Sequence, residues 1–406
     1  PTIWKNRVYL GADDGRVHCL DLQTGQTIWR FNAAPANRRM LGLGRFGSAW
    51  PVRAGVMIEE GVAYFTAGLF PGQGVFLYAL DAETGKLRYR RSLTGTGNSG
   101  PSPQGYPLSD GHSLYLTSRV APTRLDLAEG KELPFSTPYP EVKKSHQYRF
   151  YNGGTYAQIW KGQIVYGQAA LLAYDPQKTW KDKYGREQFG ELTFNWFNAR
   201  RAVFHEDMAW IATDHHLLAV EQDKLPELAK TLCREFEEAY KEHRVGSVES
   251  NLARIEEVGV DTPRAKAILE NNLRWSLEGY QKKWPPVRDA LFEKFADQCK
   301  WMTPLKANEA MAMAGDILYI GGEDRVIALD SANGKTLWEE KTGSRVRGLA
   351  IADGRLYVST INGVVRCFGG GKGNGKSLAS SPPADALDAK TVKLAESILA
   401  AAHAEG

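Results

Sequence analysis

The sequence is poor in cysteine, and no two of its four cysteines lie close together. Cys19, Cys233, Cys299 and Cys367 therefore lack the spacing of a zinc knuckle or a redox Cys-x-x-Cys motif. Cys19 and Cys367 occupy the same place in two copies of an internal repeat, which predicts small, buried strand residues. Cys233 and Cys299 bracket a helical stretch and could pair in an oxidising compartment, a question that the sequence leaves open.

Long apolar runs and a dominant charge are also absent. No apolar run is long enough to span a bilayer. Lys and Arg together number 51 and Asp and Glu 47, so the net charge is only +4 at pH 7. This balance excludes the concentrated basic face that nucleic-acid binding requires. The sequence also shows no nucleophile-elbow pattern and no recognisable Ser/His/Asp or Cys/His catalytic grouping.

The sequence does contain a strand–turn–strand pattern, which is clearest between Val75 and Tyr89. Alternating apolar residues predict a half-buried strand that leads into Asp81. Asp81 is suited to open a turn, because its carboxylate can accept hydrogen bonds from the backbone N–H groups just ahead of it. Gly85 closes that turn, at a position where a left-handed residue should have no Cβ. Tyr89 then returns an aromatic side chain to the packed face.

The same pattern recurs along the chain, and an internal repeat decides the architecture before any other signal does. Each turn follows a second apolar strand, and these strands give seven units. Two further copies end in tryptophan, one has its aromatic residue a place late, and two are weak. The copies are Asp21–Gly25 with Trp29, Asp330–Gly334 with Trp338, Asp126–Gly130 with Phe135, and the turns at Asp175 and Glu221.

Each unit supplies short strands separated by turns, without helices. In the second unit the predicted strands are Gly55–Glu60, Val62–Gly68, Val75–Ala82 and Lys86–Leu93. This pattern predicts an antiparallel meander, and a meander repeated around an axis is a propeller blade. Closure into a ring also hides most strand edges. We therefore predict an all-β fold, a seven- to eight-bladed propeller of four-stranded antiparallel blades, formed by residues 1–221 and 301–368.

The last unit is incomplete. It runs through Gly348–Asp353, Arg355–Ile361 and Gly363–Phe368 and then passes into glycine-rich sequence, so its fourth strand is missing. Propellers usually complete such a blade with a strand from the opposite end of the chain. Because the sequence starts at Pro1, in the lead-in to a repeat, we expect that residues upstream have been lost or removed, and an eighth unit could lie among them.

Three segments lie outside the repeat. Residues 222–300 form a helical insertion in the fifth blade, with helices expected from Leu225 to Tyr240 and at about 248–257, 263–282 and 286–299, punctuated by Thr262-Pro263 and Pro285-Pro286. We expect these helices to fold back on the blade, and a partner-docking arm is the alternative. Residues 369–387 have the composition of a flexible linker. Residues 388–406 form an alanine-rich C-terminal helix with too little core to stand alone.

The turn motifs at Asp81–Lys86 and Asp330–Trp338 resemble the tryptophan-docking motif of propellers with pyrroloquinoline quinone (PQQ) type repeats. That family includes quinoprotein alcohol dehydrogenases and the non-enzymatic propeller of the outer-membrane assembly machinery. The stretches Ser48–Val56, Ser102–Tyr106 and Gly153–Tyr156 are similar to large planctomycete-type proteins, some of which join such repeats to a methyltransferase. The resemblance implies a propeller, an envelope, periplasmic or secreted location, and neighbouring domains beyond both ends.

A candidate ligand site follows from the propeller geometry. The connection from the outer strand of one blade to the inner strand of the next arrives beside the central axis, and here these arrivals are polar and aromatic. Several guanidiniums would then surround a few amides and one acid, which suits a small anionic or polyhydroxylated ligand. The alternative is that these side chains satisfy loop backbones and one another. The predicted rim residues are Trp50, Arg53, Gln104, Tyr106, Asn152, Tyr156, Arg200, Glu309 and Arg347, with Arg201, Asn308 and Arg345 beside them.

Quinone chemistry is not supported by the same residues. In dehydrogenases of the resembled family, PQQ lies in the axial funnel, usually with calcium, a catalytic Asp and often two adjacent cysteines. No adjacent cysteines occur here, and Glu309 is the one acid among the rim positions. We therefore predict a binding or scaffold propeller with no cofactor, no metal site and no catalytic residue. The alternatives are a PQQ-dependent dehydrogenase, or part of a larger enzyme such as a methyltransferase fusion.

Overall fold

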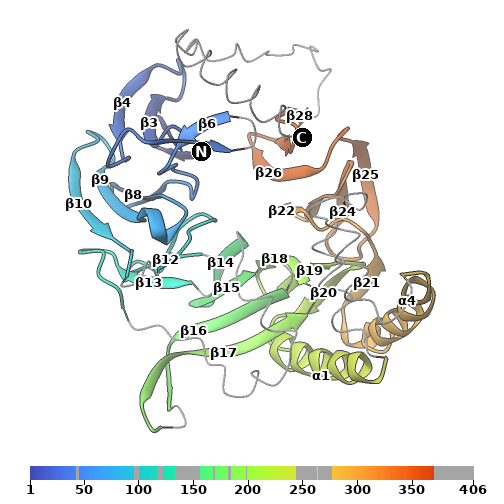
Figure 1. Cartoon of the computed structure of the whole chain (residues 1–406). Helices are drawn as coiled ribbons and strands as arrows, with labels where there is room; N and C mark the ends of the chain where they lie inside the picture. The colour runs from blue at the N-terminus through green and yellow to red at the C-terminus, as the bar shows by residue number, and fades with distance from the viewer. Residues whose placement is uncertain are drawn as a thin grey trace.

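Seven small antiparallel sheets follow one another around a common axis, as Figure 1 shows. The computed structural model describes residues 1–42, 45–95, 100–117, 122–133, 156–167, 170–181, 184–197, 199–243 and 277–369, together with residue 263. Over these residues the fold is an all-β propeller of seven blades, which confirms the fold predicted from the repeat. The linker and C-terminal helix predicted for 369–387 and 388–406 lie outside the described residues, apart from Gly369.

Five of the blades have four strands, which pair in chain order from the axis outward. Blade 1 contains β1 (Thr2–Trp4), β2 (Arg7–Gly11), β3 (Arg16–Asp21) and β4 (Thr27–Asn32), and blade 2 contains β7 (Met57–Glu59), β8 (Val62–Ala67), β9 (Phe76–Asp81) and β10 (Leu87–Ser92). Blade 4 contains β14 (Tyr156–Trp160), β15 (Gln163–Gly167), β16 (Ala170–Lys181) and β17 (Glu187–Phe197). Blade 5 contains β18 (Ala199–His205), β19 (Met208–Thr213), β20 (His216–Glu221) and β21 (Trp301–Pro304), and blade 6 contains β22 (Ala310–Ala314), β23 (Ile317–Gly321), β24 (Arg325–Asp330) and β25 (Thr336–Lys341).

The two other blades have three strands each within the described residues. Blade 3 contains β11 (Leu108–Ser109), β12 (Ser113–Leu116) and β13 (Thr123–Asp126), and blade 7 contains β26 (Val346–Ala352), β27 (Arg355–Thr360) and β28 (Val365–Gly369). A separate hairpin of β5 (Arg39–Gly42) and β6 (Arg45–Ser48) follows blade 1, and the short 3-10 helix η1 (Pro71–Gln73) interrupts blade 2. The predicted aromatic residue of blade 3, Phe135, lies outside the described residues.

The repeated Asp–Gly turn has the hydrogen bonds that the sequence predicts. The Asp81 carboxylate accepts the backbone N–H of Thr84 at 2.9 Å and its hydroxyl at 2.8 Å. These hydrogen bonds, the hydroxyl first, lower the pKa of Asp81 to about 2. Gly85 has a φ of 70°, in the left-handed region that favours glycine. Asp21 and Gly25 repeat this arrangement, with a φ of 69° at the glycine.

Neighbouring blades are joined through these turns. The carbonyl oxygen of Ala82, just after Asp81, accepts the Tyr9 hydroxyl at 3.0 Å and the Trp29 indole N–H at 3.1 Å, both from blade 1. We call this arrangement, in which a turn carbonyl accepts two aromatic donors of the preceding blade, an aromatic joint. It occurs at two other places. In blade 3 the Leu127 carbonyl accepts the hydroxyls of Tyr64 and Tyr89, and in blade 6 the Ser331 carbonyl accepts the indole N–H groups of Trp210 and Trp301.

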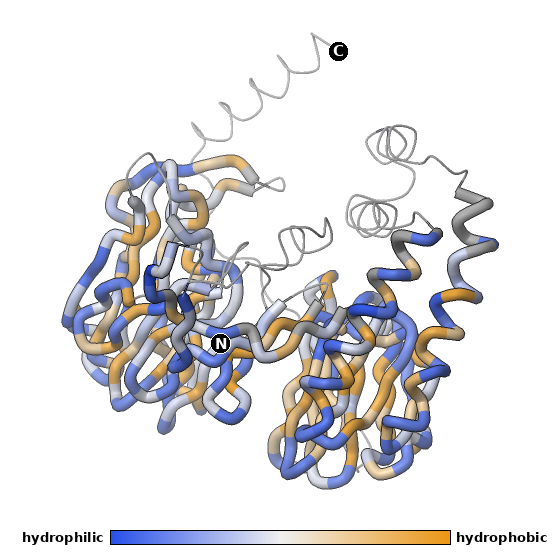
Figure 2. Tube along the Cα trace, turned by 90° about the horizontal axis from the view of Figure 1, so that it is seen from below, coloured by the Kyte–Doolittle hydropathy of each residue, from blue (hydrophilic) through white to orange (hydrophobic). Residues whose placement is uncertain are grey.

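The apolar core lies in layers between blades rather than in one central mass. Figure 2 shows apolar residues concentrated along the stacked strands and polar residues at many of the turns. Among the described residues, one buried cluster joins each pair of consecutive blades from the first to the seventh. Within the part of the chain that the structure describes, no such cluster joins blade 7 back to blade 1.

The turn of blade 1 that would receive the last blade is uncovered among the described residues. Leu22 is 43% exposed, whereas the equivalent Ala82 and Leu127 are 0% and 8% exposed. A Cβ built on Gly25 meets no described atom within 4 Å, whereas one on Gly85 would lie 2.8 Å from the Trp29 ring. Cys19 and Cys367, which occupy the same position in blades 1 and 7, also differ in exposure. Cys19 is buried as predicted, but the prediction for Cys367 is wrong, because no further described strand or blade covers β28.

The helical insertion packs on the outside of blades 4 and 5. Helix α1 (Leu225–His243) places Leu228, Leu232 and Phe236 in one buried cluster with Trp196 of β17 and Trp284 of helix α4 (Leu277–Glu293). This confirms the expected packing of the insertion on the blade. The 3-10 helix η5 (Ala296–Gln298) leads back into β21, and the helix expected at about 248–257 lies outside the described residues.

One helix boundary is predicted wrongly. Pro285 and Pro286 were expected to separate two helices, yet α4 continues through both. A proline inside a helix removes a backbone donor and crowds the preceding turn, at a cost of about 3 kcal/mol. Trp284 and Phe292 are each only 1% exposed, so burial of large side chains on either side of the prolines offsets this cost.

Gly25→Ala and Gly85→Ala form a matched pair that measures how much the aromatic joint contributes. Both substitutions place a Cβ at a φ near 70°, but only that of residue 85 meets an aromatic ring. We expect Gly25→Ala to lower the free energy of unfolding by about 1 kcal/mol through backbone strain alone. Gly85→Ala should lower it by about 2–4 kcal/mol, because overpacking adds to the strain. Urea denaturation followed by circular dichroism measures both, and equal losses would contradict the role given to the joint.

Candidate functional site

Acidic residues recur in the turn between the second and third strands of a blade. Asp13, Asp214 and Glu323 occupy this position in blades 1, 5 and 6. At the same end of the blades, the connecting loops arrive from one blade to the next, so the acids meet the predicted rim residues. We call this end of the propeller the hub face.

Guanidinium groups neutralise these acids locally. Arg53 binds Asp13 through two nitrogens, at 2.5 and 3.1 Å, in the first part of the ring. Arg200 binds Asp214 in the same two-point manner, at 2.6 and 3.2 Å. The Asn308 amide donates to the same carboxylate at 3.2 Å. Two-point pairs of this kind hold both groups in fixed orientation.

A second group of side chains gathers where blades 4, 5, 6 and 7 meet. We define the hub cluster as Tyr156, Arg201, Glu309, Arg345 and Arg347. Tyr156 begins β14, Arg201 lies on β18 and Arg347 on β26, and Figure 1 shows these inner strands nearest the centre of the ring. The connecting loops supply Glu309 and Arg345. The structure therefore brings together three of the predicted rim residues, Tyr156, Glu309 and Arg347.

Arg201 is the cation at the centre of this cluster. Its Nε donates to the Glu309 backbone carbonyl at 2.9 Å and a terminal nitrogen donates to the Arg200 carbonyl at 2.6 Å. Its guanidinium carbon lies 5.2 Å from the centre of the Tyr156 ring, which is cation–π distance. Burial is the main cause that lowers the pKa of Arg201; Tyr156 and Glu309 act to raise it, and the charges of Arg200 and Arg347 act to lower it. No ion pair between Arg201 and a described carboxylate is present.

Hydrogen bonds of its hydroxyl group hold the Tyr156 ring beside the Arg201 guanidinium. Its hydroxyl lies 2.5 Å from the Ala202 carbonyl and 3.1 Å from the Ala202 N–H. Burial raises the pKa of Tyr156 to about 12, so the phenol is neutral at physiological pH. The acidic side of the cluster is Glu309, which lies 3.8 Å from Arg345; Arg345 is also 4.0 Å from Glu323.

The other described rim residues are not part of the hub cluster. Trp50 is 8% exposed, packs in the core between blades 1 and 2, and donates its indole N–H to the Gln73 carbonyl at 2.7 Å. The ring of Tyr106, 49% exposed, lies against Gly55. The Gln104 backbone N–H donates to the Thr117 carbonyl at 3.2 Å. Asn152 is outside the described residues.

Sequence reasoning did not select the acidic partners of the rim guanidiniums. The second strands of blades 1 and 6 end at Gly11 and Gly321. Asp13 and Glu323 each lie two residues after that glycine. Alignment of the repeats at that glycine would have identified the recurring acid. No comparable signal in the sequence predicts the contact between Arg288 of the helical insertion and His215 in the turn of blade 5.

Among the described residues of the helical insertion, one polar contact reaches the hub face. A terminal nitrogen of Arg288 on α4 lies 2.8 Å from Nε2 of His215, which neighbours Asp214. A guanidinium can only donate, so Nε2 accepts and the imidazole is neutral. Burial, and then the Arg288 charge, lower the pKa of His215 to about 4. The neighbouring His216 faces away and its ring centre lies 4.5 Å from that of Phe292.

The described hub residues do not fit a calcium–quinone centre. A hard cation such as calcium requires several oxygen ligands. Asp214 is bound by Arg200 and Asn308, and Glu309 faces Arg345, so the nearest carboxylates are engaged by cations and amides. The described residues also contain no group of three or more His, Cys, Asp or Glu that could hold a metal ion.

Comparison with known proteins places the chain in a family. The model of the PQQ-type repeat family described as outer membrane protein assembly factor BamB matches residues 13–133 and 283–390, more than half of the chain. The chain belongs to this family. A crystal structure of BamB from Moraxella catarrhalis has 13% sequence identity and a TM-score of 0.46, and the match covers 89% of this chain and 81% of that one.

Relatives of this PQQ-type propeller include enzyme subunits. The dehydrogenase subunit of a quinone alcohol dehydrogenase from Gluconobacter oxydans (strain 621H) is 27% identical over 198 residues, which is 47% of this chain and 22% of that protein. The corresponding subunit from Gluconacetobacter polyoxogenes is 35% identical over 201 residues, with the same coverage. The match thus spans about a fifth of the length of these subunits. No described helix is long and apolar enough to cross a membrane.

The neutral His215 predicts a pH dependence of stability. Its pKa is 6.5 in an unfolded chain and about 4 when folded, so the unfolded state binds the additional proton as the pH falls between these values. Stability should be fully present above pH 6.5 and decrease toward pH 4, by up to about 2 kcal/mol after allowance for solvent screening. Urea denaturation at pH 7.5 and 4.5 tests this. The control is His215→Gln, which should lose less stability on acidification than the wild type.

Proposed function

We propose that this propeller is a binding module whose hub cluster binds a small anionic ligand. The observation that carries the proposal is Arg201, a partly buried guanidinium with no carboxylate partner among the described residues and with Arg347 close enough to lower its pKa. Two like charges held together disfavour their own ionised state, and a bound anion relieves this repulsion. Guanidiniums also match the geometry of carboxylate and phosphate groups.

The distribution of charge supports an anion rather than a neutral polyol. Arg53 and Arg200 are each matched by one aspartate, and Arg345 lies between Glu309 and Glu323. Arg201 and Arg347 have no such match within the described residues. The Tyr156 ring beneath Arg201 holds the guanidinium in place. A ligand with one carboxylate or phosphate group therefore suits the cluster better than a sugar without charge.

Substitution of Arg347 tests the proposal. Arg347 is exposed, so Arg347→Ala should leave the fold intact. We expect isothermal titration calorimetry with inorganic phosphate to show binding to the wild type that is about tenfold weaker or more in Arg347→Ala, because a charge-assisted hydrogen bond is lost. Arg53→Ala is the matched control, since Arg53 is an exposed hub-face arginine already paired with Asp13. Equal weakening by both variants, or no binding by the wild type, would refute the hub cluster as the site.

A PQQ-dependent dehydrogenase is the second candidate, supported by the similarity to the two alcohol dehydrogenase subunits. The family relation supplies the propeller, while the engaged carboxylates argue against a calcium-dependent centre in this segment. Addition of PQQ with and without calcium, followed by a dye-linked assay of alcohol oxidation, distinguishes the two functions. Binding without turnover supports the binding module, whereas alcohol-dependent dye reduction establishes the enzyme.

We further propose that the propeller works in the cell envelope and as part of a larger protein. The description of the family model names an outer membrane assembly factor, and this supports the location. The fusion to a methyltransferase remains a prediction from sequence resemblance. Determination of the reading frame on both sides of residues 1–406 would reveal a secretion signal or a cofactor-binding methyltransferase motif, and absence of both would refute this part of the proposal.

A further inference from the structure

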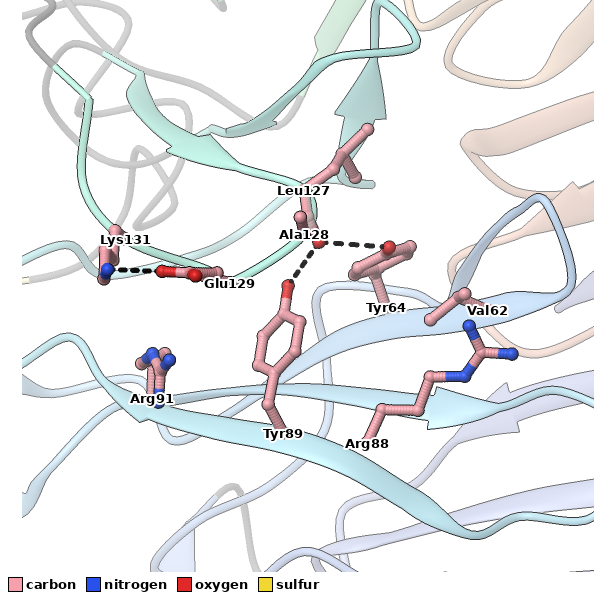
Figure 3. Close-up of a pocket in the computed structure, with 9 residues that line it drawn as sticks. All are labelled: Val62, Tyr64, Arg88, Tyr89, Arg91, Leu127, Ala128, Glu129 and Lys131. Atoms are coloured by element: carbon pink, nitrogen blue, oxygen red, sulfur yellow. Dashed lines mark hydrogen bonds and ion pairs between the residues drawn. The ribbon is translucent and has the colours of Figure 1, made fainter.

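A hollow of about 530 Å³ lies between blades 2 and 3, away from the hub cluster (Figure 3). Strands β8 and β10 form one side and the turn after Asp126 forms the other. Its volume is within the range of small-molecule sites in proteins. The side chains that matter for its chemistry are Tyr64, Arg88, Tyr89, Arg91, Glu129 and Lys131.

The hollow exists because this aromatic joint has the smallest side chains. The joint of blades 1 and 2 uses Tyr9 and Trp29, and that of blades 5 and 6 uses two tryptophans. Here two phenols, Tyr64 and Tyr89, reach the Leu127 carbonyl instead, with their ring centres 6.5 Å apart. Blade 3 also has only three described strands, so no described fourth strand covers the turn from outside.

The charges around the hollow leave one guanidinium without an acid. Arg88 is paired with Asp81 at 3.1 Å, and Lys131 forms an ion pair with Glu129. The Arg91 guanidinium carbon lies 5.6 Å from the centre of the Tyr89 ring, and it forms no ion pair with a described residue. Asp126 lies behind the turn, where its carboxylate accepts the backbone N–H of Glu129 at 2.8 Å.

We propose that this hollow is a second binding site, specific for a small aromatic carboxylate. The carboxylate binds the Arg91 guanidinium, which offers a planar pair of donors, while Lys131 stays paired with Glu129 at the rim. The aromatic ring packs against the rings of Tyr64 and Tyr89, where offset or edge contacts are favourable. The site does not depend on the hub cluster, because none of its residues belongs to that cluster.

Tyr89→Trp is the decisive variant, because tryptophan occupies the same position in the other aromatic joints, at Trp29 and Trp301. The larger ring should fill the hollow while preserving the bond to Leu127. With benzoate as the probe, nuclear magnetic resonance titration should show binding to the wild type that becomes about tenfold weaker or more in Tyr89→Trp. Arg91→Gln removes the cation alone and should have a comparable effect, since a charge-assisted hydrogen bond is lost.

Three controls keep the result interpretable. Trp29→Tyr makes the converse change at the joint of blades 1 and 2 and should leave benzoate affinity unchanged. Benzyl alcohol, which has the ring without the charge, should bind the wild type at least tenfold more weakly than benzoate. Arg347→Ala should not affect benzoate, and an effect there would assign binding to the hub cluster instead. Failure of the wild type to bind, or unchanged affinity in Arg91→Gln, would overturn the proposal even if Tyr89→Trp failed to fold.

Discussion

One backbone carbonyl that accepts two aromatic donors is the interaction on which the arrangement of the blades depends. The oxygen of Ala82 receives Tyr9 and Trp29, and the oxygens of Leu127 and Ser331 receive equivalent pairs. Because both donors come from the preceding blade, the bond fixes the angle between two sheets that share no strand hydrogen bonds. The apolar layers between blades then pack around this fixed point.

The same geometry creates both candidate sites. When each blade is held at a fixed angle, its inner strand and connecting loop bring polar side chains to the hub face. Most of these side chains neutralise one another locally, as Arg53 and Asp13 do, and so stabilise the loops. Arg201 and Arg347 form no ion pair with a described carboxylate, because Glu309, the acid of the hub cluster, faces Arg345. The hollow at Tyr64 and Tyr89 arises at a joint in which smaller rings leave space.

Membership of the family explains the propeller fold of this chain, but not the side chains at its hub. In this chain the Asp–Gly turns and the aromatic donors hold neighbouring blades together. The hub side chains lie on inner strands and connecting loops, and a fold by itself does not determine the chemistry of such a site. In this chain Asp214 binds Arg200 and Glu309 faces Arg345, so these two hub carboxylates are engaged by guanidinium groups.

The sequence by itself determined the repeat, the strand order, the Asp–Gly turns and the all-β propeller, because each of these follows from local periodicity and turn chemistry. It also predicted Tyr156, Glu309 and Arg347 as rim residues, three side chains that the structure places near one another. Only the tertiary structure decided that Trp50 is buried, that Cys367 is uncovered, that α4 runs through Pro285 and Pro286, and that Arg288 meets His215. Those outcomes depend on which distant segment covers a side chain, and local sequence carries no record of such contacts.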